Sequence, residues 1–200
     1  DVIIASGGSS LRTIYMLRKY LKSTPLVSIA HGGEVTERSL WRRTYTKKGF
    51  DISDKIICVS NYTRKKVIEI GIDSQLTSVI YNGSDIKRFY PLAPTDEFIK
   101  RFSLEGKKVL LTVGSIDQRK GQDIVLRALP EIRKTYPNIY YLAVGKIQEW
   151  PELQQIIQQY DLQDNVHFAG ILTNEEILEA YNACDIYVLP SRHTQLGDFE

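Results

Sequence analysis

A short polar segment between an apolar run and a helical pattern has the residue types that bind an anion. In VGSIDQRKGQDIVLRAL (residues 113–129), Gly114 ends the apolar run, and Arg119, Lys120 and Gly121 directly precede the helical pattern. Backbone N–H groups at a helix start attract negative charge, and glycine lets an anion approach the backbone closely. The segment therefore predicts an anion site, and the alternative is a solvated charged loop.

Other residues that could contact a ligand also follow strand-like runs. They are Gly7 and Gly8, His31, the 114–121 loop, Gly145, Gly170 and the stretch from Pro190 onward. In open parallel sheets, ligands bind outside the carboxyl ends of the strands. His31 stands between an apolar run and two glycines, which favours a place in a site over a structural role.

Eight strand-like runs alternate with helical patterns and must position these residues. The runs are residues 2–5, 26–30, 55–59, 78–80, 108–113, 139–144, 165–168 and 185–190. The 108–113 run is almost continuously apolar, which is typical of a strand buried on both faces of a parallel sheet. Alternating strands and helices predict two α/β units with right-handed crossovers.

Local signals mark the ends of several helices. Ser60 is expected to cap one helix, and Gly71 to follow its last turn. Thr173 and Glu176 have the spacing of a capping box. Pro130, inside a helical pattern, predicts a kink or a break there.

Composition limits the class of protein. The 200 residues are 42% apolar and 25% charged, enough for a core in one or two domains. No apolar run approaches membrane-spanning length, and no signal-peptide pattern is present. Cys58 and Cys184 predict buried free thiols of a reducing compartment, with a disulfide between them as the alternative. The three histidines and two cysteines have no metal-ligand spacing.

Charge and turn residues divide the chain. Residues 1–66 contain 13 Lys or Arg against 5 Asp or Glu, and the remainder contains 13 against 19. This asymmetry indicates separate roles for the two halves. The stretch YPLAPTDEFIKRFSLEGK breaks the strand–helix alternation and precedes a new strand. We therefore predict a domain of residues 1–90, a linker of 91–106 and a domain of 107–200.

Five stretches in this order carry a family resemblance. They are DKIICVSNYTRKKVIEIGI, VIYNGSDIKRFYP, VGSIDQRKGQDIVLRAL, NVHFAGILTNEEILEAYNACDIYVLPS and GDFE. Together they resemble family 4 of the retaining glycosyltransferases (glycosyl transferases group 1). The resemblance implies the GT-B fold, in which two Rossmann-like domains face a cleft. The chain opens without Met and closes on LGDFE, so we expect a fragment with both domains incomplete.

The resemblance implies transfer of a sugar from a nucleotide diphosphate sugar with retention at the anomeric carbon. The amino-terminal domain would hold the acceptor and the carboxy-terminal domain the donor. No cofactor or metal is expected, because protein cations neutralise the diphosphate. Lys120 corresponds to the diphosphate lysine, with Gly114 allowing close approach. The family usually has arginine where Ser115 stands, and Arg119 is the nearby cation that could compensate.

The remaining site residues follow from the same resemblance. Glu200 corresponds to the first glutamate of the Glu-x7-Glu motif, beside the donor sugar. His31 corresponds to the histidine that faces this sugar across the cleft, and both are predicted catalytic residues. The backbone of Gly170 and Ile171, with Gly145, is expected to contact the nucleotide base. Gly7 and Gly8 are assigned to the acceptor side.

The resemblance also implies classes of donor and acceptor. A UDP-sugar or GDP-sugar donor and a glycan, lipid-linked or small-molecule acceptor are expected. The basic stretch ERSLWRRTYTKKGF (residues 37–50) predicts a solvated helix with Trp41 packed inward. The alternative for this stretch is peripheral contact with an anionic membrane. The protein is expected to be cytoplasmic.

Other functions remain open at this point. An epimerase acting on a nucleotide sugar would have the same fold, and a non-catalytic nucleotide-sugar-binding module would tolerate Ser115. No Gly-x-Gly-x-x-Gly follows a strand, which is unfavourable to a dinucleotide oxidoreductase. No nucleic-acid partner is expected, because the basic amino-terminal third contains no recognised motif.

Overall fold

The protein folds into two α/β units in a computed structural model, which describes residues 1–21, 23–36, 39–148 and 150–192. Unit 1 comprises Asp1–Ser84, and unit 2 begins at Asp85. Each unit is built on a four-stranded parallel sheet, as the alternation of strands and helices predicts.

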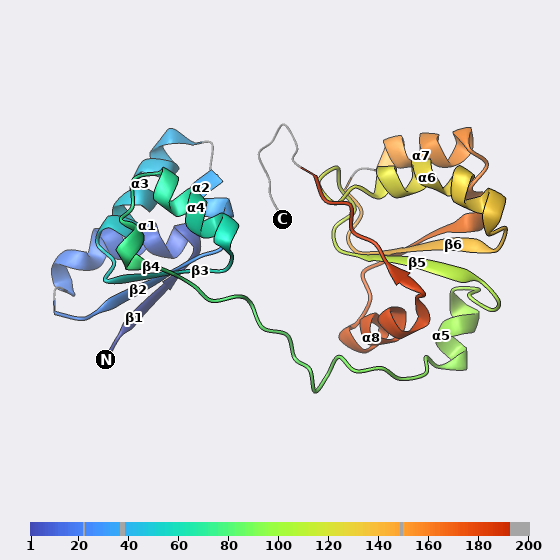
Figure 1. The fold of residues 1–200 in the computed structure, drawn as a ribbon, viewed down its shortest axis with the longest axis horizontal. Helices are drawn as coiled ribbons and strands as arrows, with labels where there is room; N and C mark the ends of the chain where they lie inside the picture. Colours follow the sequence, from blue (N-terminus) through green and yellow to red (C-terminus); the bar gives the residue numbers. More distant parts are fainter. Residues whose placement is uncertain (22, 37–38, 149, 193–200) are drawn as a thin grey trace. The chain divides into compact units, whose positions relative to one another are not determined.

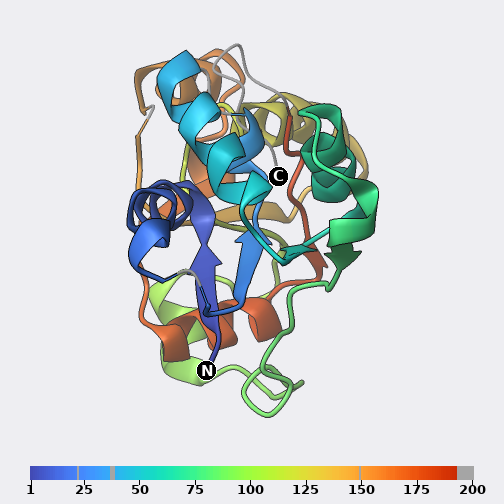
Figure 2. The ribbon, with the colours of Figure 1, turned by 90° about the vertical axis from the view of Figure 1, so that its left-hand side faces the viewer.

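The sheet of unit 1 has the order β1-β2-β3-β4. Its strands are β1 (Ile3–Ser6), β2 (Leu26–Ala30), β3 (Lys55–Cys58) and β4 (Thr77–Val79). Its helices are α1 (Gly7–Leu17), α2 (Gly33–Thr36), α3 (Leu40–Asp51) and α4 (Asn61–Glu69), with 3-10 turns η1 (Arg18–Tyr20) and η2 (Ser74–Leu76). The four α-helices lie over one face of the sheet, and β1 and β2 run side by side in the same direction (Figures 1 and 2).

The core of unit 1 lies between this face and the helices. Leu11, Leu26, Phe50, Ile56 and Val67 are fully buried there. α1 and α3 pack closely because Gly49 has no side chain, and a Cβ at Gly49 would lie 2.7 Å from the carbonyl oxygen of Leu11. This packing fixes α1, which begins directly after β1.

The sheet of unit 2 has the order β7-β6-β5-β8. Its strands are β5 (Lys108–Val113), β6 (Ile139–Val144), β7 (Val166–Gly170) and β8 (Ile186–Tyr187). Its helices are α5 (Asp96–Arg101), α6 (Gln122–Thr135), α7 (Trp150–Gln159) and α8 (Asn174–Ala183), with the 3-10 turn η3 (Gln163–Asn165). α6 and α7 cover one face of the sheet, and α5 and α8 cover the other (Figure 1). Because β5 and β6 are covered on both faces, their sequences are nearly continuous apolar runs.

The predicted linker, residues 91–106, contains part of the core of unit 2. α5 lies within it, and Phe98, Phe102 and Leu104 are buried against the sheet. Burial of these three apolar side chains stabilises unit 2, whereas a linker would not bury apolar side chains in the core of a domain. The segment from α5 onward therefore belongs structurally to unit 2.

Most of the local helix signals are confirmed. The Ser60 hydroxyl accepts the Thr63 N–H at 3.0 Å, and Gly71 has a φ of +89° just after α4. Thr173 and Glu176 form the predicted capping box. Of the kink or break predicted at Pro130, the break is wrong, because α6 continues through Pro130 to Thr135.

The two cysteines are free thiols. Cys58 is buried in unit 1, and Cys184 is half-buried in unit 2. This confirms free thiols over the disulfide alternative. Burial raises the pKa of the Cys58 thiol to about 11, with a smaller opposing effect of Arg64.

Candidate functional site

Three glycines end three neighbouring strands of unit 2. Gly114 follows β5 and donates its N–H to the Val144 carbonyl at 2.8 Å. Gly145 follows β6 and donates to the Gly170 carbonyl at 2.8 Å. The φ angles of Gly114 and Gly145 are +154° and +146°, and a Cβ at Gly145 would lie 1.9 Å from the Gly114 carbonyl oxygen. The carboxyl ends of β5, β6 and β7 thus form a shelf of closely packed backbone.

Lys120 lies over this shelf. A Cβ at Gly114 would lie 3.4 Å from Lys120 Cε and 3.8 Å from Lys120 Nζ. The backbone N–H of Lys120 donates to the side chain and carbonyl of Asp117, each at 3.1 Å, which closes the loop into a turn. The turn therefore brings Lys120 next to Gly114, although the two residues are six positions apart in the sequence.

Arg119 has a different environment. Its guanidinium lies 3.8 Å from the Asp117 carboxylate, and the two side chains are only 24% and 16% exposed. Its carbonyl oxygen accepts the Arg192 N–H at 2.9 Å. Because a carboxylate already opposes the charge of Arg119, the compensation for Ser115 expected from Arg119 is reduced.

Gln122, which was not predicted from the sequence, anchors the 114–121 loop through a hydrogen bond to Ser115. Gln122 is 1% exposed, and its Nε2 donates to the Ser115 carbonyl at 2.8 Å. Its Oε1 is buried without a hydrogen-bond partner among the described residues. A signal was present, because Gln122 shares the helical spacing of Val125, Leu126 and Leu129, all buried in α6.

Gly121 sits at the cap of α6, where the chain also meets the segment after β8. Its φ is +74°, and a Cβ there would lie 2.2 Å from the Pro190 carbonyl oxygen. In the next turn, Arg192 donates to the Asp123 carboxylate at 2.9 Å. This ion pair opposes the charge of Asp123, the acid in the first turn of α6, and links the segment after β8 to the start of that helix.

Gly170 and Ile171 complete the edge of the shelf. Gly170 adopts a φ of +70°, and the Ile171 side chain is 77% exposed. The capping box of Thr173 and Glu176 fixes the turn that follows. The structure thus places the residues predicted for the phosphate and for the base in one continuous row along the sheet.

In unit 1, a second group gathers at the carboxyl ends of β1 and β2. The His31 Nε2 atom lies 2.9 Å from the Ser6 hydroxyl, and the His31 backbone N–H donates to Glu34 at 2.6 Å. Gly7 starts α1 with a φ of +77°, and a Cβ at Gly8 would lie 3.1 Å from Glu34 Cβ. The predicted residues Gly7, Gly8 and His31 therefore share one end of the sheet.

Ser6 and Glu34 were not predicted from the sequence. Glu34 is buried although it is charged, and its carboxylate fixes the backbone that carries His31. The remaining predicted catalytic residue, Glu200, lies outside the described residues. The functional roles of all these residues stay predictions.

Most of the basic stretch lies in α3, where Trp41 is exposed, Tyr45 is partly buried and Phe50 is buried. Trp41 is 56% exposed, so the expectation of Trp41 packed inward is wrong. Its ring contacts Tyr45 at 5.1 Å, and the Lys48 ammonium lies 5.1 Å from the Tyr45 ring. The α3 helix already packs against α1 through Gly49 and Phe50, so Trp41 has no place in that core. Among the described residues, no helix is both long and apolar enough to cross a membrane.

Comparison with known proteins identifies the class. Residues 95–198 match the family described as "Glycosyl transferases group 1", and residues 1–88 match "Glycosyltransferase Family 4". The first match covers more than half of the chain, so the chain belongs to the glycosyl transferases group 1. The predicted family and the GT-B fold class are both confirmed.

Two solved structures show the fold likeness. The chain superposes on Anabaena Alr3699/HepE, solved in complex with UDP and glucose, with a TM-score of 0.82 and 24% identity. That match covers 96% of this chain and 53% of the Anabaena chain. For sucrose-phosphate synthase from Thermosynechococcus elongatus, the TM-score is 0.78 at 22% identity, over 95% of this chain and 50% of that one.

Two curated relatives are similar in sequence. The phosphatidylinositol N-acetylglucosaminyltransferase GPI3 subunit of Saccharomyces cerevisiae is 27% identical over 72% of this chain and 32% of its own length. A GDP-mannose-dependent monoacylated alpha-(1-6)-phosphatidylinositol monomannoside mannosyltransferase of Corynebacterium glutamicum is 26% identical over 87% of this chain and 46% of its own length. The chain thus spans about a third of the first relative's length and just under half of the second's.

Proposed function

We propose that the full-length protein transfers a sugar from a nucleotide diphosphate sugar to a glycan, lipid-linked or small-molecule acceptor. The observation that carries this proposal is the position of Lys120 over Gly114, on the backbone shelf of Gly114, Gly145 and Gly170. Family membership supports the same reaction class. The donor is a UDP-sugar or a GDP-sugar, since one similar structure holds UDP and one relative is named as GDP-mannose-dependent.

The proposed role of unit 2 is to stabilise the leaving nucleoside diphosphate. Negative charge grows on the diphosphate as the bond to the sugar breaks, so a fixed cation stabilises the transition state more than the ground state. Lys120 supplies that cation, and the start of α6 adds backbone N–H dipoles. The Ser115 hydroxyl can donate a hydrogen bond to phosphate but supplies no charge. Main-chain groups of Gly145, Gly170 and Ile171 would contact the base.

Retention at the anomeric carbon and metal independence are also part of the proposal. His31 would contact the sugar from the acceptor side, held through its backbone by Glu34 and near Ser6. Glu200 would lie beside the donor sugar. Protein cations, rather than a divalent metal, would oppose the charge of the diphosphate.

For the acceptor, we propose a lipid-linked or saccharide molecule met at a membrane surface from the cytoplasm. Leu40 and Trp41 are exposed on α3, which also carries Arg42, Arg43 and Lys48. Exposed aromatic and basic side chains on one helix suit the interface of an anionic bilayer. The names of both sequence relatives include phosphatidylinositol, which supports a lipid acceptor.

The experiment uses the full-length protein with UDP-glucose and GDP-mannose as donors. Phosphatidylinositol and neutral oligosaccharides serve as acceptors, and anomeric NMR identifies the product configuration. Transfer with retention that persists in EDTA is expected, and Glu200→Ala should lower turnover while nucleoside diphosphate binding stays unchanged. An inverted product, or activity lost in EDTA and restored by Mg²⁺, would contradict the mechanism. Product formed without any acceptor would indicate an epimerase instead.

A further inference from the structure

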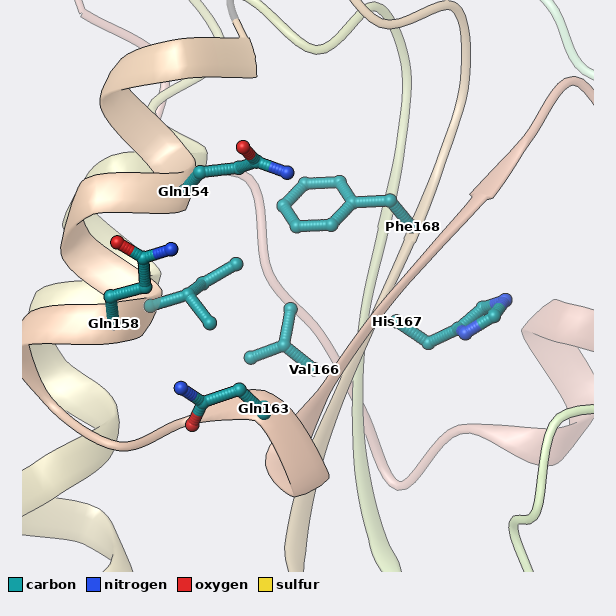
Figure 3. A pocket seen from close by; sticks show the side chains of 7 residues that line it. Gln154, Gln158, Gln163, Val166, His167 and Phe168 are labelled. Carbon is teal, nitrogen blue, oxygen red and sulfur yellow. The ribbon is translucent and has the colours of Figure 1, made fainter.

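A pocket lies on unit 2 beside β7, which is the edge strand of the sheet order β7-β6-β5-β8. It has a volume of about 440 Å³ and lies among α7, η3 and β7 (Figure 3). Gln154 and Gln158 of α7, Gln163 of η3, Ile157, Val166 and Phe168 line it. Val166 begins β7 and Gly170 ends it, so the pocket extends along the strand away from the glycine shelf.

The rim of this pocket consists of three carboxamides. Gln154 and Gln158 are four residues apart on α7, which places them on the same face of the helix. Gln163 reaches the pocket from the other end of the loop after α7 (Figure 3). Within the described part of the chain, the side chains of these glutamines have no hydrogen-bond partner, so their donors and acceptors are available to a ligand.

The floor of the pocket is apolar and fixed. Ile157, Val166 and Phe168 are half-buried and pack against the core that includes α6 and α7. His167 also borders the pocket, but its ring points away from Val166 and Phe168 (Figure 3) and contacts Phe102 at a centroid distance of 5.5 Å. No Asp, Glu, Lys or Arg is among the described residues that line the pocket.

This combination selects a class of ligand. A charged ligand would meet no opposite charge among the described lining residues. A purely apolar ligand would displace water from three carboxamides and form no hydrogen bonds with them in exchange. A sugar ring has neutral hydroxyls on its edges and apolar C–H faces, which match the amide rim and the Phe168 floor. The volume falls within the range of small-molecule sites, roughly 300–1,000 Å³.

We propose that the pocket between α7 and β7 is a second saccharide site, which binds a neutral oligosaccharide apart from the nucleotide shelf. The preference for a saccharide over a neutral peptide rests on the proposed function, because a glycosyltransferase meets glycans as substrates or products. A long glycan would be bound here through sugar residues that are distant from its reacting end. Such a second contact raises the effective concentration of a long glycan at the enzyme.

The test titrates the full-length protein with neutral trisaccharides of glucose, mannose, galactose and N-acetylglucosamine by calorimetry. Hydrogen–deuterium exchange then maps the binding site of any trisaccharide that binds. At least one is expected to bind and to protect α7, η3 and β7. Gln158→Leu and Gln154→Leu remove a carboxamide at similar volume, and each should weaken binding about tenfold, equal to about 1.4 kcal/mol.

Matched controls are present on the same helix. Gln155 and Gln159 are exposed on α7 outside the pocket lining, so Gln155→Leu and Gln159→Leu should leave binding within about twofold. UDP and GDP binding, measured in parallel, should be unchanged in the Gln154 and Gln158 variants. Lys120→Ala should weaken nucleotide binding and leave trisaccharide binding intact, so failure of the two proposals can be told apart.

Three outcomes would overturn the saccharide site. They are the absence of binding by all four trisaccharides, binding that all four glutamine variants leave equal, and protection that maps outside α7, η3 and β7. Binding of a neutral extended peptide along β7 in place of every trisaccharide would likewise replace this proposal with strand addition.

Discussion

Lys120 lies directly over Gly114, with its Cε 3.4 Å from the point where a methyl group at Gly114 would stand. This contact places the positive charge of Lys120 at the carboxyl end of β5, where the strand is followed by a residue without a side chain. The loop keeps this geometry because Asp117 accepts the Lys120 N–H and Gln122 holds the Ser115 carbonyl.

Lys120→Ala should weaken UDP and GDP binding while uridine and guanosine binding changes little. A charge-assisted contact to phosphate is worth on the order of 1.5–3 kcal/mol, or about 10–100-fold in affinity. Isothermal titration of the four ligands measures the difference. Lys134→Ala removes an exposed cation of the same unit, paired with Glu131, and serves as the control. Equal losses for UDP and uridine would remove Lys120 from the phosphate site.

Ser115→Arg should maintain or tighten nucleoside diphosphate binding, by up to about tenfold. The Arg119 charge is already opposed by Asp117, so a new cation after Gly114 adds charge that the loop lacks. Ser115→Ala is the matched control, because it keeps the backbone contact from Gln122 and adds no charge. If Ser115→Arg weakens binding well below Ser115→Ala, the loop does not present residue 115 to the phosphate.

Gly145→Ala should destabilise the protein by on the order of 3 kcal/mol or more. Its φ of +146° is unfavourable for an L-residue, and the new Cβ would lie 1.9 Å from the Gly114 carbonyl oxygen. Urea unfolding followed by circular dichroism measures the loss. Gly106→Ala is the control: Gly106 also has a positive φ, +65°, but a Cβ there meets nothing within 4 Å. It should cost only about 1–2 kcal/mol, and similar losses for both variants would disprove the close packing.

The sequence predicted which residues stand at the ends of the strands, and their roles in a site stay predictions. Gly114, Gly145 and Gly170 each follow an apolar run, and parallel strands bring their carboxyl ends to one edge. Gln122 and Glu34 were missed, because both are buried polar residues whose hydrogen-bond partners are determined only by the fold. Gln122 contacts Ser115 seven residues away, and no local pattern specifies that contact.

The errors in the fold have similar causes. Local propensity favoured a break at Pro130, but burial of Leu126 and Leu129 against the sheet holds α6 together on both sides of it. Trp41 was expected to pack inward. The buried contacts of α3 are made instead by Gly49 and Phe50, which lie near the other end of the helix, and Gly49 packs against Leu11 of α1. In both cases tertiary packing decided what the local sequence left open.

The last prediction concerns acid stability. The carboxylate of Asp185 accepts the Lys108 ammonium at 2.9 Å and the Val109 N–H at 2.8 Å, where β8 joins β5. The Lys108 side chain first, and then the Val109 N–H, hold the pKa of Asp185 below its ordinary value. A lowered folded pKa contributes stability that is present above the unfolded value of about 3.9 and is lost as the pH falls through the folded value.

Asp185→Asn should therefore reduce stability at neutral pH and flatten its decline between about pH 5 and about pH 2. The effect should shrink in high salt, because the pair is partly exposed to solvent. Urea unfolding at a series of pH values measures both trends. Asp164→Asn, at an exposed acid in η3, changes the same charge without this contact and should reproduce the slope of the unsubstituted protein. Parallel pH profiles for the unsubstituted protein and Asp185→Asn would show that the Lys108–Asp185 pair does not link β8 to the sheet in solution.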